Sequence, residues 1–109
     1  MRLGQHQEAF FRDLLKLGIH ALSLGYEIRG GELQRPIEMQ ELYIKMGRSK
    51  TMRSEHLNKC AIDLYFTKKG KLVYPEELGR YWESLDTRNS AGMFWKSFKD
   101  GPHYQRSTR

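Results

Sequence analysis

The strongest strand signal in the chain is CAIDLYF, residues 60–66. The turn-forming segment KKGK at 68–71 follows it, so LVY at 72–74 is predicted to return as the second strand of a hairpin. Alternate residues of the first strand form an apolar face, which we expect to lie against the core. Asp63 projects from the opposite face, where strand propensity and burial both disfavour an aspartate. This carboxylate is therefore either solvent-exposed or paired with a cation.

The remaining pattern predicts further helices and strands around this hairpin. The predicted helices cover 7–24, 36–46 and 75–86, the other strands cover 26–28 and a short final segment within 94–104, and loops cover 48–55 and 87–93. We therefore expect one α+β domain over residues 1–109, with a small, mainly antiparallel sheet packed against about three helices. Residues 105–109 are expected to form a flexible basic tail.

The composition excludes several classes of protein. With 109 residues, of which 39% are hydrophobic, the chain can form one modest core and is too apolar for a disordered segment. No apolar run approaches the roughly 20 residues of a membrane span, and the N-terminus lacks the apolar segment of a signal peptide. A single cysteine, Cys60, excludes an internal disulfide framework. We therefore expect a protein that is made in a cytosol.

The net charge of +6, from 19 Lys and Arg against 13 Asp and Glu, favours a polyanionic partner. Nucleic acid, teichoic acid, lipopolysaccharide and a carboxylate-rich polymer all meet this requirement. The basic residues are scattered, with small groups at 48–50, 68–71 and 106–109, and solvated faces account for most of them. A dedicated nucleic-acid site is therefore not expected.

Two of the four histidines come with local chemistry. His56 lies just before the strand that carries Asp63, and His103 ends the segment DGPH. By contrast, His20 is expected to pack within the first helix, and His6 has no predicted role. Two histidines and one carboxylate are sufficient protein ligands for a catalytic zinc ion, with the fourth position left for water. The spacing alone leaves the solvent-exposed aspartate open as the alternative.

Two sequence motifs resemble those of a known family. Residues 54–63 (SEHLNKCAID) look like the S-x-H-x-x-G-x-A-x-D motif of the M15 zinc peptidases, the D-alanyl-D-alanine carboxypeptidase group. Residues 100–103 (DGPH) look like its second signature, an acidic residue three positions before the last histidine. The longer segments 47–57 and 95–104 are similar to the phage endolysin branch, the L-alanyl-D-glutamate endopeptidases. RPIEMQ at 35–40 is similar to an R-x-x-x-x-Q segment at the start of the family's second helix.

The chain departs from the family pattern at two places. Lys59 stands where the first motif has glycine, which bears on the geometry of the turn before the strand. The endolysin branch often carries W-G-G before its final tryptophan, whereas this chain has AGMF at 91–94 before Trp95. The second departure bears on the rim of the substrate cleft.

The resemblance implies a hedgehog-like α+β fold with a zinc cleft on one face of the sheet. By position, His56, Asp63 and His103 would bind one Zn²⁺ ion. Asp100 would act as general base and then as general acid, since it can accept the proton of a water molecule and return it to the leaving amine.

The same resemblance implies three residues around the substrate. Arg35 would stabilise the oxyanion or bind a substrate carboxylate, for which a planar guanidinium is suited. Ser54 would form a hydrogen bond near the cleft, and Trp95 would form part of the core or of the cleft wall. For Arg35 a surface turn is the alternative, and for Ser54 an ordinary loop hydroxyl.

The implied function is zinc-dependent hydrolysis of an amide bond in the peptidoglycan stem peptide, with the L-Ala–D-Glu bond favoured. The protein would be a monomeric, antimicrobial phage or prophage endolysin, made in the host cytoplasm without a signal peptide. It would reach the cell wall with the help of a separate holin-type protein. The alternatives are a D,D-carboxypeptidase or dipeptidase on D-Ala-D-Ala, a basic nucleic-acid-binding protein, and an inactive zinc-binding relative.

Overall fold

The computed structural model describes residues 1–31, 42, 44–45 and 55–109. Within them, two helices and five strands form an α+β fold with a mainly antiparallel sheet, as the sequence predicts. In chain order the elements are α1 (Leu3–Ser23), β1 (Glu27–Gly30), β2 (Ala61–Lys68), β3 (Lys71–Val73), α3 (Glu76–Leu85), β4 (Asn89–Ala91), the 3-10 helix η1 (Gly92–Phe94) and β5 (His103–Arg106). No helix in this described part has the length and apolar character needed to cross a membrane.

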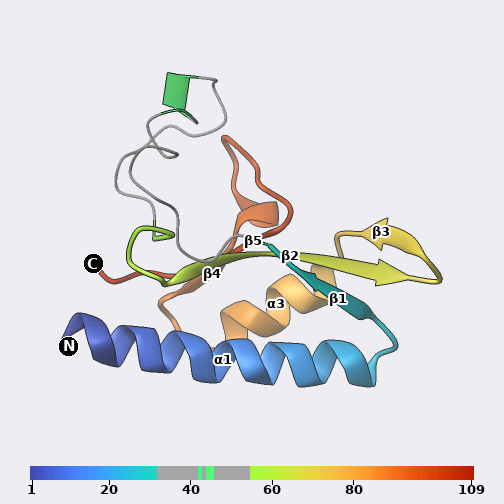
Figure 1. The fold of residues 1–109 in the computed structure, drawn as a ribbon, viewed down its shortest axis with the longest axis horizontal. Coiled ribbons are helices and arrows are strands. Elements are labelled where there is room, and N and C mark those ends of the chain that lie inside the picture. The colour runs from blue at the N-terminus through green and yellow to red at the C-terminus, as the bar shows by residue number, and fades with distance from the viewer. Residues whose placement is uncertain (32–41, 43, 46–54) are drawn as a thin grey trace.

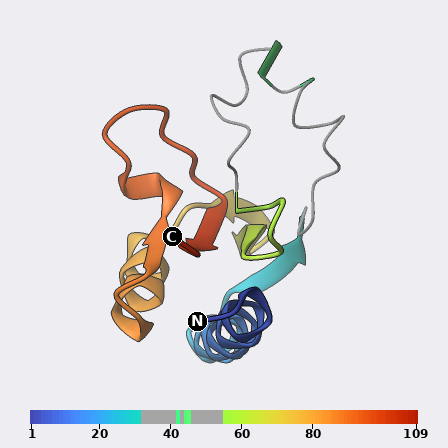
Figure 2. The same ribbon diagram turned by 90° about the vertical axis from the view of Figure 1, so that its left-hand side faces the viewer.

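The sheet is organised around β2. Its strand order is β1-β2-β5-β4, and β3 pairs with the C-terminal end of β2 as the predicted hairpin. Phe66 pairs with both Ile28 of β1 and Val73 of β3, so these two strands lie on opposite edges of β2. Both helices lie on the same side of the sheet (Figures 1 and 2).

The core between the sheet and the two helices is built on aromatic rings. Trp82 of α3 contacts Phe10 of α1 and Tyr104 of β5 edge to face, with ring centroids 5.6 and 6.1 Å apart. Phe66 of β2 contacts Tyr104 in the same way at 5.9 Å, and all four rings are buried. Such pairs contribute roughly 0.5–1.5 kcal/mol each beyond their buried area. The core therefore fixes β5 against both β2 and α3.

Side-chain alternation along β2 and β5 separates the core from a second, polar face. Leu64 and Phe66 are buried in the core, whereas Asp63 is only partly buried, as the sequence predicts. In β5, Tyr104 packs in the core, so His103 before it projects from the opposite face. The sheet thus has one face covered by helices and one face that carries the chemistry-bearing residues.

Some predicted elements differ from the structure. Residues 87–93, expected to be a loop, contain β4 and the start of η1. The residues of β4 have low strand propensity, so pairing with β5 makes them a strand. The final strand begins only at His103, after bends and turns. Most of the predicted helix at 36–46 lies outside the described residues, although its positions 42, 44 and 45 are helical.

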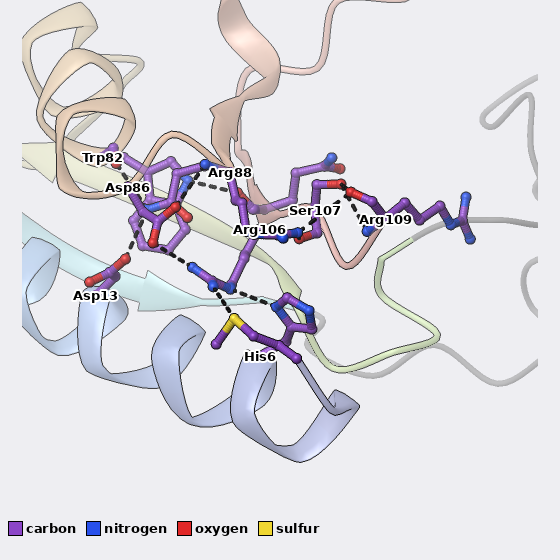
Figure 3. Close-up of polar contacts among 11 residues, drawn as sticks. His6, Asp13, Trp82, Asp86, Arg88, Arg106, Ser107 and Arg109 are labelled. Carbon is purple, nitrogen blue, oxygen red and sulfur yellow. Dashed lines mark hydrogen bonds and ion pairs between the residues drawn. The ribbon is translucent and has the colours of Figure 1, made fainter.

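The expected flexible tail at 105–109 is wrong for its first two residues. Gln105 and Arg106 belong to β5, and Arg106 is only 2% exposed. Its guanidinium donates from Nε to His6 Nδ1 at 3.2 Å and from Nη1 to Asp86 Oδ2 at 2.8 Å. Figure 3 shows Arg106 between these two partners. The contacts compensate for the loss of hydration of a buried cation, so the end of the chain is held in the fold.

Both histidines of α1 make contacts within the fold. His20 is half-buried and stacks on Tyr81 of α3 with 4.0 Å between ring centroids, as expected for a packed residue at the boundary. His6, for which no role was predicted, is buried and accepts the hydrogen bond from Arg106. Burial lowers the pKa of His6, and the charges of Arg106 and Arg88 lower it further. The His6 ring is therefore neutral beside the guanidinium.

Candidate metal centre

Three side chains converge on the face of the sheet opposite the helices. They are His56, Asp63 and His103, and one ligand atom of each lies within 4.8 Å of the other two. Asp63 Oδ1 is 3.5 Å from His56 Nε2 and 3.7 Å from His103 Nδ1. Both histidines are buried, and the Asp63 side chain is 18% exposed. The fold thus brings together the three residues that the sequence analysis singled out as metal ligands.

The register of two strands places two members of this cluster. Asp63 of β2 lies directly opposite His103 of β5. Residues paired in this way project from the same face, with Cβ atoms about 5 Å apart. The backbone amide of Leu64 donates to the carbonyl of Pro102 at 2.8 Å, which holds the turn that leads into β5. The positions of both side chains therefore follow from the backbone ladder.

The third member, His56, comes from the turn at residues 55–59. The amides of Asn58 and Cys60 donate to the carbonyl of Glu55 at 3.1 and 2.9 Å and close the turn. Lys59 leaves it with φ at 57°, in the left-handed region. Glycine, the residue of the similar family motif, reaches this region freely, whereas a side chain costs roughly 1–2 kcal/mol. Lys59 thus adopts a backbone conformation that favours glycine.

The carboxylate of Glu55 ties this turn to the end of the chain. It accepts hydrogen bonds from Asn58 Nδ2 at 2.9 Å, from the backbone amide of Thr108 at 3.1 Å and from Thr108 Oγ1 at 2.9 Å. Glu55 is 5% exposed, and three donors compensate for burial of its charge. The C-terminal residues therefore help to hold the turn that carries His56.

The ring of His103 is held on several sides. Its Nε2 lies 2.7 Å from Gln105 Oε1, and its Nδ1 faces Asp63. The rings of Trp95 and His56 lie 4.9 and 5.0 Å from it, centroid to centroid. Trp95 is half-buried and lies beside the cluster.

Asp100 lies at the open side of the cluster. Its Oδ2 is 3.8 Å from His103 Nδ1, and its side chain is 41% exposed. Its backbone amide donates to the carbonyl of Gly92 at 3.0 Å. A Cβ atom on Gly92 would lie 2.3 Å from the Asp100 carbonyl oxygen, so the segment that carries Asp100 packs against a position that requires glycine. Asp100 thus lies beside the cluster with its side chain partly exposed to solvent.

The charge distribution at the cluster suits a cation. Burial alone would raise the pKa of Asp63, but its polar contacts with His103 and His56 outweigh burial and lower that pKa below its ordinary value. At 3.5 and 3.7 Å these contacts are longer than hydrogen bonds. Asp63 Oδ1 is buried and accepts no hydrogen bond from the residues that the structure describes. A buried, ionised oxygen of this kind requires a cation or a donor.

The donor set also suits the metal that the sequence suggests. Two imidazole nitrogens and one carboxylate oxygen are ligands that zinc accepts at catalytic sites, where three protein ligands leave a position for water. The nearby Cys60 is buried, and burial raises the pKa of its thiol to about 11, so it is a core residue and not a thiolate ligand. The described residues therefore fit a single metal ion of the zinc type.

The remaining residues of the site are two that the sequence predicts and two that it does not. Arg35 and Ser54 lie outside the described residues. Sequence reasoning missed the roles of Glu55 and Gln105, which contact the predicted ligands or the turn that carries them. For Gln105 a usable signal was its position two residues after His103, since alternate residues of a strand share a face. For Glu55 no local signal identified Thr108 as its partner.

The fold is similar to that of a solved peptidase. The crystal structure of the Serratia marcescens L-Ala D-Glu endopeptidase ChiX matches it with a TM-score of 0.67 and 24% sequence identity, over 97% of this chain and 86% of that chain. This likeness shows that the two proteins share a fold. The sequence matches no protein-family model and no curated protein.

Proposed function

We propose that this protein is a zinc-dependent peptidase that hydrolyses an amide bond in the stem peptide of peptidoglycan, with the L-Ala–D-Glu bond favoured. The observation that carries the proposal is the cluster of His56, Asp63 and His103, whose ligand atoms lie within 4.8 Å of one another. The substrate class is supported by the fold shared with an L-Ala D-Glu endopeptidase and by the two sequence motifs.

The three clustered residues would hold the metal, and their environment suits that role. The partly buried Asp63 would supply a negative charge, and the two histidines would supply nitrogen ligands from rings that packing holds in place. A bound zinc ion lowers the pKa of its water ligand to about 7 and polarises a carbonyl oxygen. The chain's contribution is to hold the ligands rigidly on a strand pair and on a short, hydrogen-bonded turn.

Asp100 would carry the proton during hydrolysis. Its carboxylate accepts a proton from the attacking water, whose oxygen forms the new bond to the carbonyl carbon of the substrate. It then returns that proton to the amide nitrogen as the C–N bond breaks, and the products are a carboxylate and an amine. With Oδ2 at 3.8 Å from His103 Nδ1 and a partly exposed side chain, Asp100 lies within reach of both the cluster and solvent.

Residues beside the cluster would position the peptide. Trp95, whose ring lies 4.9 Å from that of His103, would form one wall of the substrate cleft. We assign oxyanion stabilisation or carboxylate binding to Arg35 and a hydrogen bond near the cleft to Ser54, on the sequence resemblance alone. The net charge of +6 would attract the protein to the anionic wall, where it would act as an endolysin released by a separate holin-type protein.

Digestion of purified peptidoglycan, with mass spectrometry of the products, tests the proposal. The zinc-loaded protein is expected to separate L-Ala from D-Glu in the stem peptide. Loss of only a terminal D-Ala would instead identify a D,D-carboxypeptidase. Asp100→Asn should retain zinc and lose hydrolysis, whereas His56→Ala should lose both. An active protein that contains no metal would overturn the proposal, as would full activity in Asp100→Asn.

A further inference from the structure

The contact between His103 and Gln105 favours a proton on one particular nitrogen of the His103 ring. His103 Nε2 lies 2.7 Å from Gln105 Oε1, a hydrogen-bond distance. A carbonyl oxygen can only accept a hydrogen bond, so this contact is a hydrogen bond when Nε2 carries the proton. In a neutral ring, Nδ1 then has a free lone pair, and Nδ1 is the atom that lies 3.7 Å from Asp63 Oδ1. A proton on Nε2 thus leaves the lone pair of His103 Nδ1 facing Asp63, where a metal could bind.

Gln105 is held firmly enough for this task. Its backbone pairs with Ala61 of β2 on one side and with Ser90 of β4 on the other. Its carbonyl oxygen also accepts a hydrogen bond from Trp82 Nε1 at 3.0 Å. Gln105 lies two residues after His103 in the same strand, so both side chains project from the same face. The small side chain of Ala61 lies directly opposite and leaves space for the amide.

Other groups around His103 favour the opposite arrangement. The carboxylates of Asp63 and Asp100 lie 3.7 and 3.8 Å from His103 Nδ1, and each attracts a proton to that nitrogen. A proton on Nδ1 blocks metal binding there, because a metal ligand needs the lone pair. Without the acceptor at Nε2, the two carboxylates would therefore compete directly with the metal.

We propose that Gln105 is a positioning residue that keeps the proton of His103 on Nε2 and so reserves Nδ1 for the metal. The inference rests on the metal site of the proposed function and on no property of the substrate. Loss of such a supporting hydrogen bond typically weakens metal binding by about 10- to 100-fold. We expect an effect of this size when the acceptor on residue 105 is removed.

Three variants separate this role from general packing. Gln105→Met keeps the length of the side chain and removes the acceptor, whereas Gln105→Glu keeps an acceptor at the same position. Ser90→Ala alters the residue paired with Gln105 on β4 and serves as the matched control. Zinc affinity is measured for each metal-free protein by competition with a chromophoric chelator. We expect binding about 10- to 100-fold weaker in Gln105→Met, and close to wild type in the other two.

The second measurement reports the proton directly and needs neither metal nor substrate. The ¹⁵N chemical shifts of the His103 ring are recorded for the metal-free protein, at a pH where the ring is neutral. Wild type and Gln105→Glu should carry the proton on Nε2, and Gln105→Met should shift it toward Nδ1. A wild-type ring protonated on Nδ1 would overturn the inference, as would unchanged zinc affinity in Gln105→Met.

The two measurements also separate this inference from the proposed function. A wild-type protein that binds no zinc would contradict the function, while the ring shifts would still decide the role of Gln105. If Gln105→Met does not fold, the wild-type ring shifts and the Gln105→Glu affinity still test the inference. A Gln105→Glu protein that binds zinc ten times more weakly than wild type would contradict it.

Discussion

Strand β5 separates two polar clusters that both contain buried histidine but differ in charge. On the helix side, Arg106 donates from Nε to His6 Nδ1 and from Nη1 to Asp86 Oδ2, and its Nη2 lies 3.6 Å from the sulfur of Met1 (Figure 3). On the other side, the cluster of His56, Asp63 and His103 brings ligand atoms together around Asp63 Oδ1.

The difference lies in where the positive charge comes from. In the Arg106 cluster the chain supplies its own cation, and the acceptors around it are arranged to receive its N–H groups. In the cluster of His56, Asp63 and His103, the Oδ1 of Asp63 is buried and accepts no hydrogen bond from the described residues. Converging acceptors of this kind indicate a site for an added cation. The Arg106 cluster is therefore complete within the chain, whereas the cluster of His56, Asp63 and His103 could hold a metal ion.

The largest effect is expected for Asp63→Asn, which keeps the shape of the side chain and removes its charge. A neutral amide is a poor zinc ligand, so bound zinc and wall hydrolysis should fall to background. The stability of the metal-free protein should change little, since the variant also removes a buried charge. Metal analysis, a peptidoglycan assay and thermal unfolding measure the three quantities. Retention of stoichiometric zinc would contradict the comparison at its central point.

The opposite outcome is expected at Arg106. Arg106→Met leaves Asp86 and the buried His6 without their donor, and we expect a loss of about 3 kcal/mol in the free energy of unfolding. The matched control is Arg80→Met, which removes an exposed partner of Glu76 on α3 and should cost at most about 0.5 kcal/mol. Urea unfolding of the metal-free proteins gives both values. Equal losses in the two variants would show that the buried Arg106 cluster contributes no more to the free energy of unfolding than an exposed ion pair does.

The sequence predicted the face of Asp63 but not the Arg106 cluster, for a physical reason. The grouping of Asp63 with His56 and His103 came from the resemblance to the family motifs. The face of Asp63 follows from alternation along one strand, a local property. By contrast, Arg106 reaches His6 from the opposite end of the chain, and no local pattern reports such a contact. A basic residue three positions before the last one is typical of a solvated tail, which is what the local sequence predicts here.

Only the local part of the sheet follows from the sequence, because local patterns indicate a hairpin but not the pairing of distant strands. The β2–β3 hairpin follows from a strong strand and a local turn, and it was predicted correctly. The pairing of β5 with both β2 and β4 joins residues that are distant in sequence, and β4 has low strand propensity. Gln105 was therefore placed in a tail, although it lies in the middle of this pairing. Nonlocal pairing is the property that local patterns do not report.

A smaller effect on stability is expected from a fall in pH, and it concerns His6 of the Arg106 cluster. The pKa of His6 is lowered by burial and by Arg106, Arg88 and the N-terminus, against a smaller opposite effect of Glu55. Because the folded pKa lies below the ordinary value of 6.5, the contribution of His6 to stability is complete above pH 6.5. It is lost as the pH falls through the lowered value, because the unfolded chain binds the proton more readily.

The variant His6→Gln isolates this contribution. Glutamine has no proton to gain in this range and can still accept a hydrogen bond from Arg106. Thermal unfolding with a chelator present, from pH 7.5 to 5, should therefore show a shallower loss of stability in His6→Gln than in wild type. All residues other than residue 6 are the same in both proteins, so the comparison isolates His6. Parallel pH profiles would indicate that His6 does not titrate between the two states.

The smallest expected effect concerns the turn at 55–59, which is bonded to the end of the chain and carries His56. It carries His56 to the metal site, and its Glu55 binds Thr108 just beyond Arg106. Lys59 holds a φ of 57°, so Lys59→Gly should relieve strain and stabilise the metal-free protein by up to about 1 kcal/mol. The gain is limited because glycine also increases the freedom of the unfolded chain.

Lys59→Ala is the control, because it removes the charge and the long side chain but keeps the Cβ atom that causes the strain. It should show no gain in the free energy of unfolding, and zinc affinity should stay close to wild type in both variants. An equal gain in Lys59→Ala would assign the effect to the lysine side chain and not to the backbone. A large change in zinc affinity would show that Lys59 alters the position of His56, so that the departure from the glycine motif tunes the metal site itself.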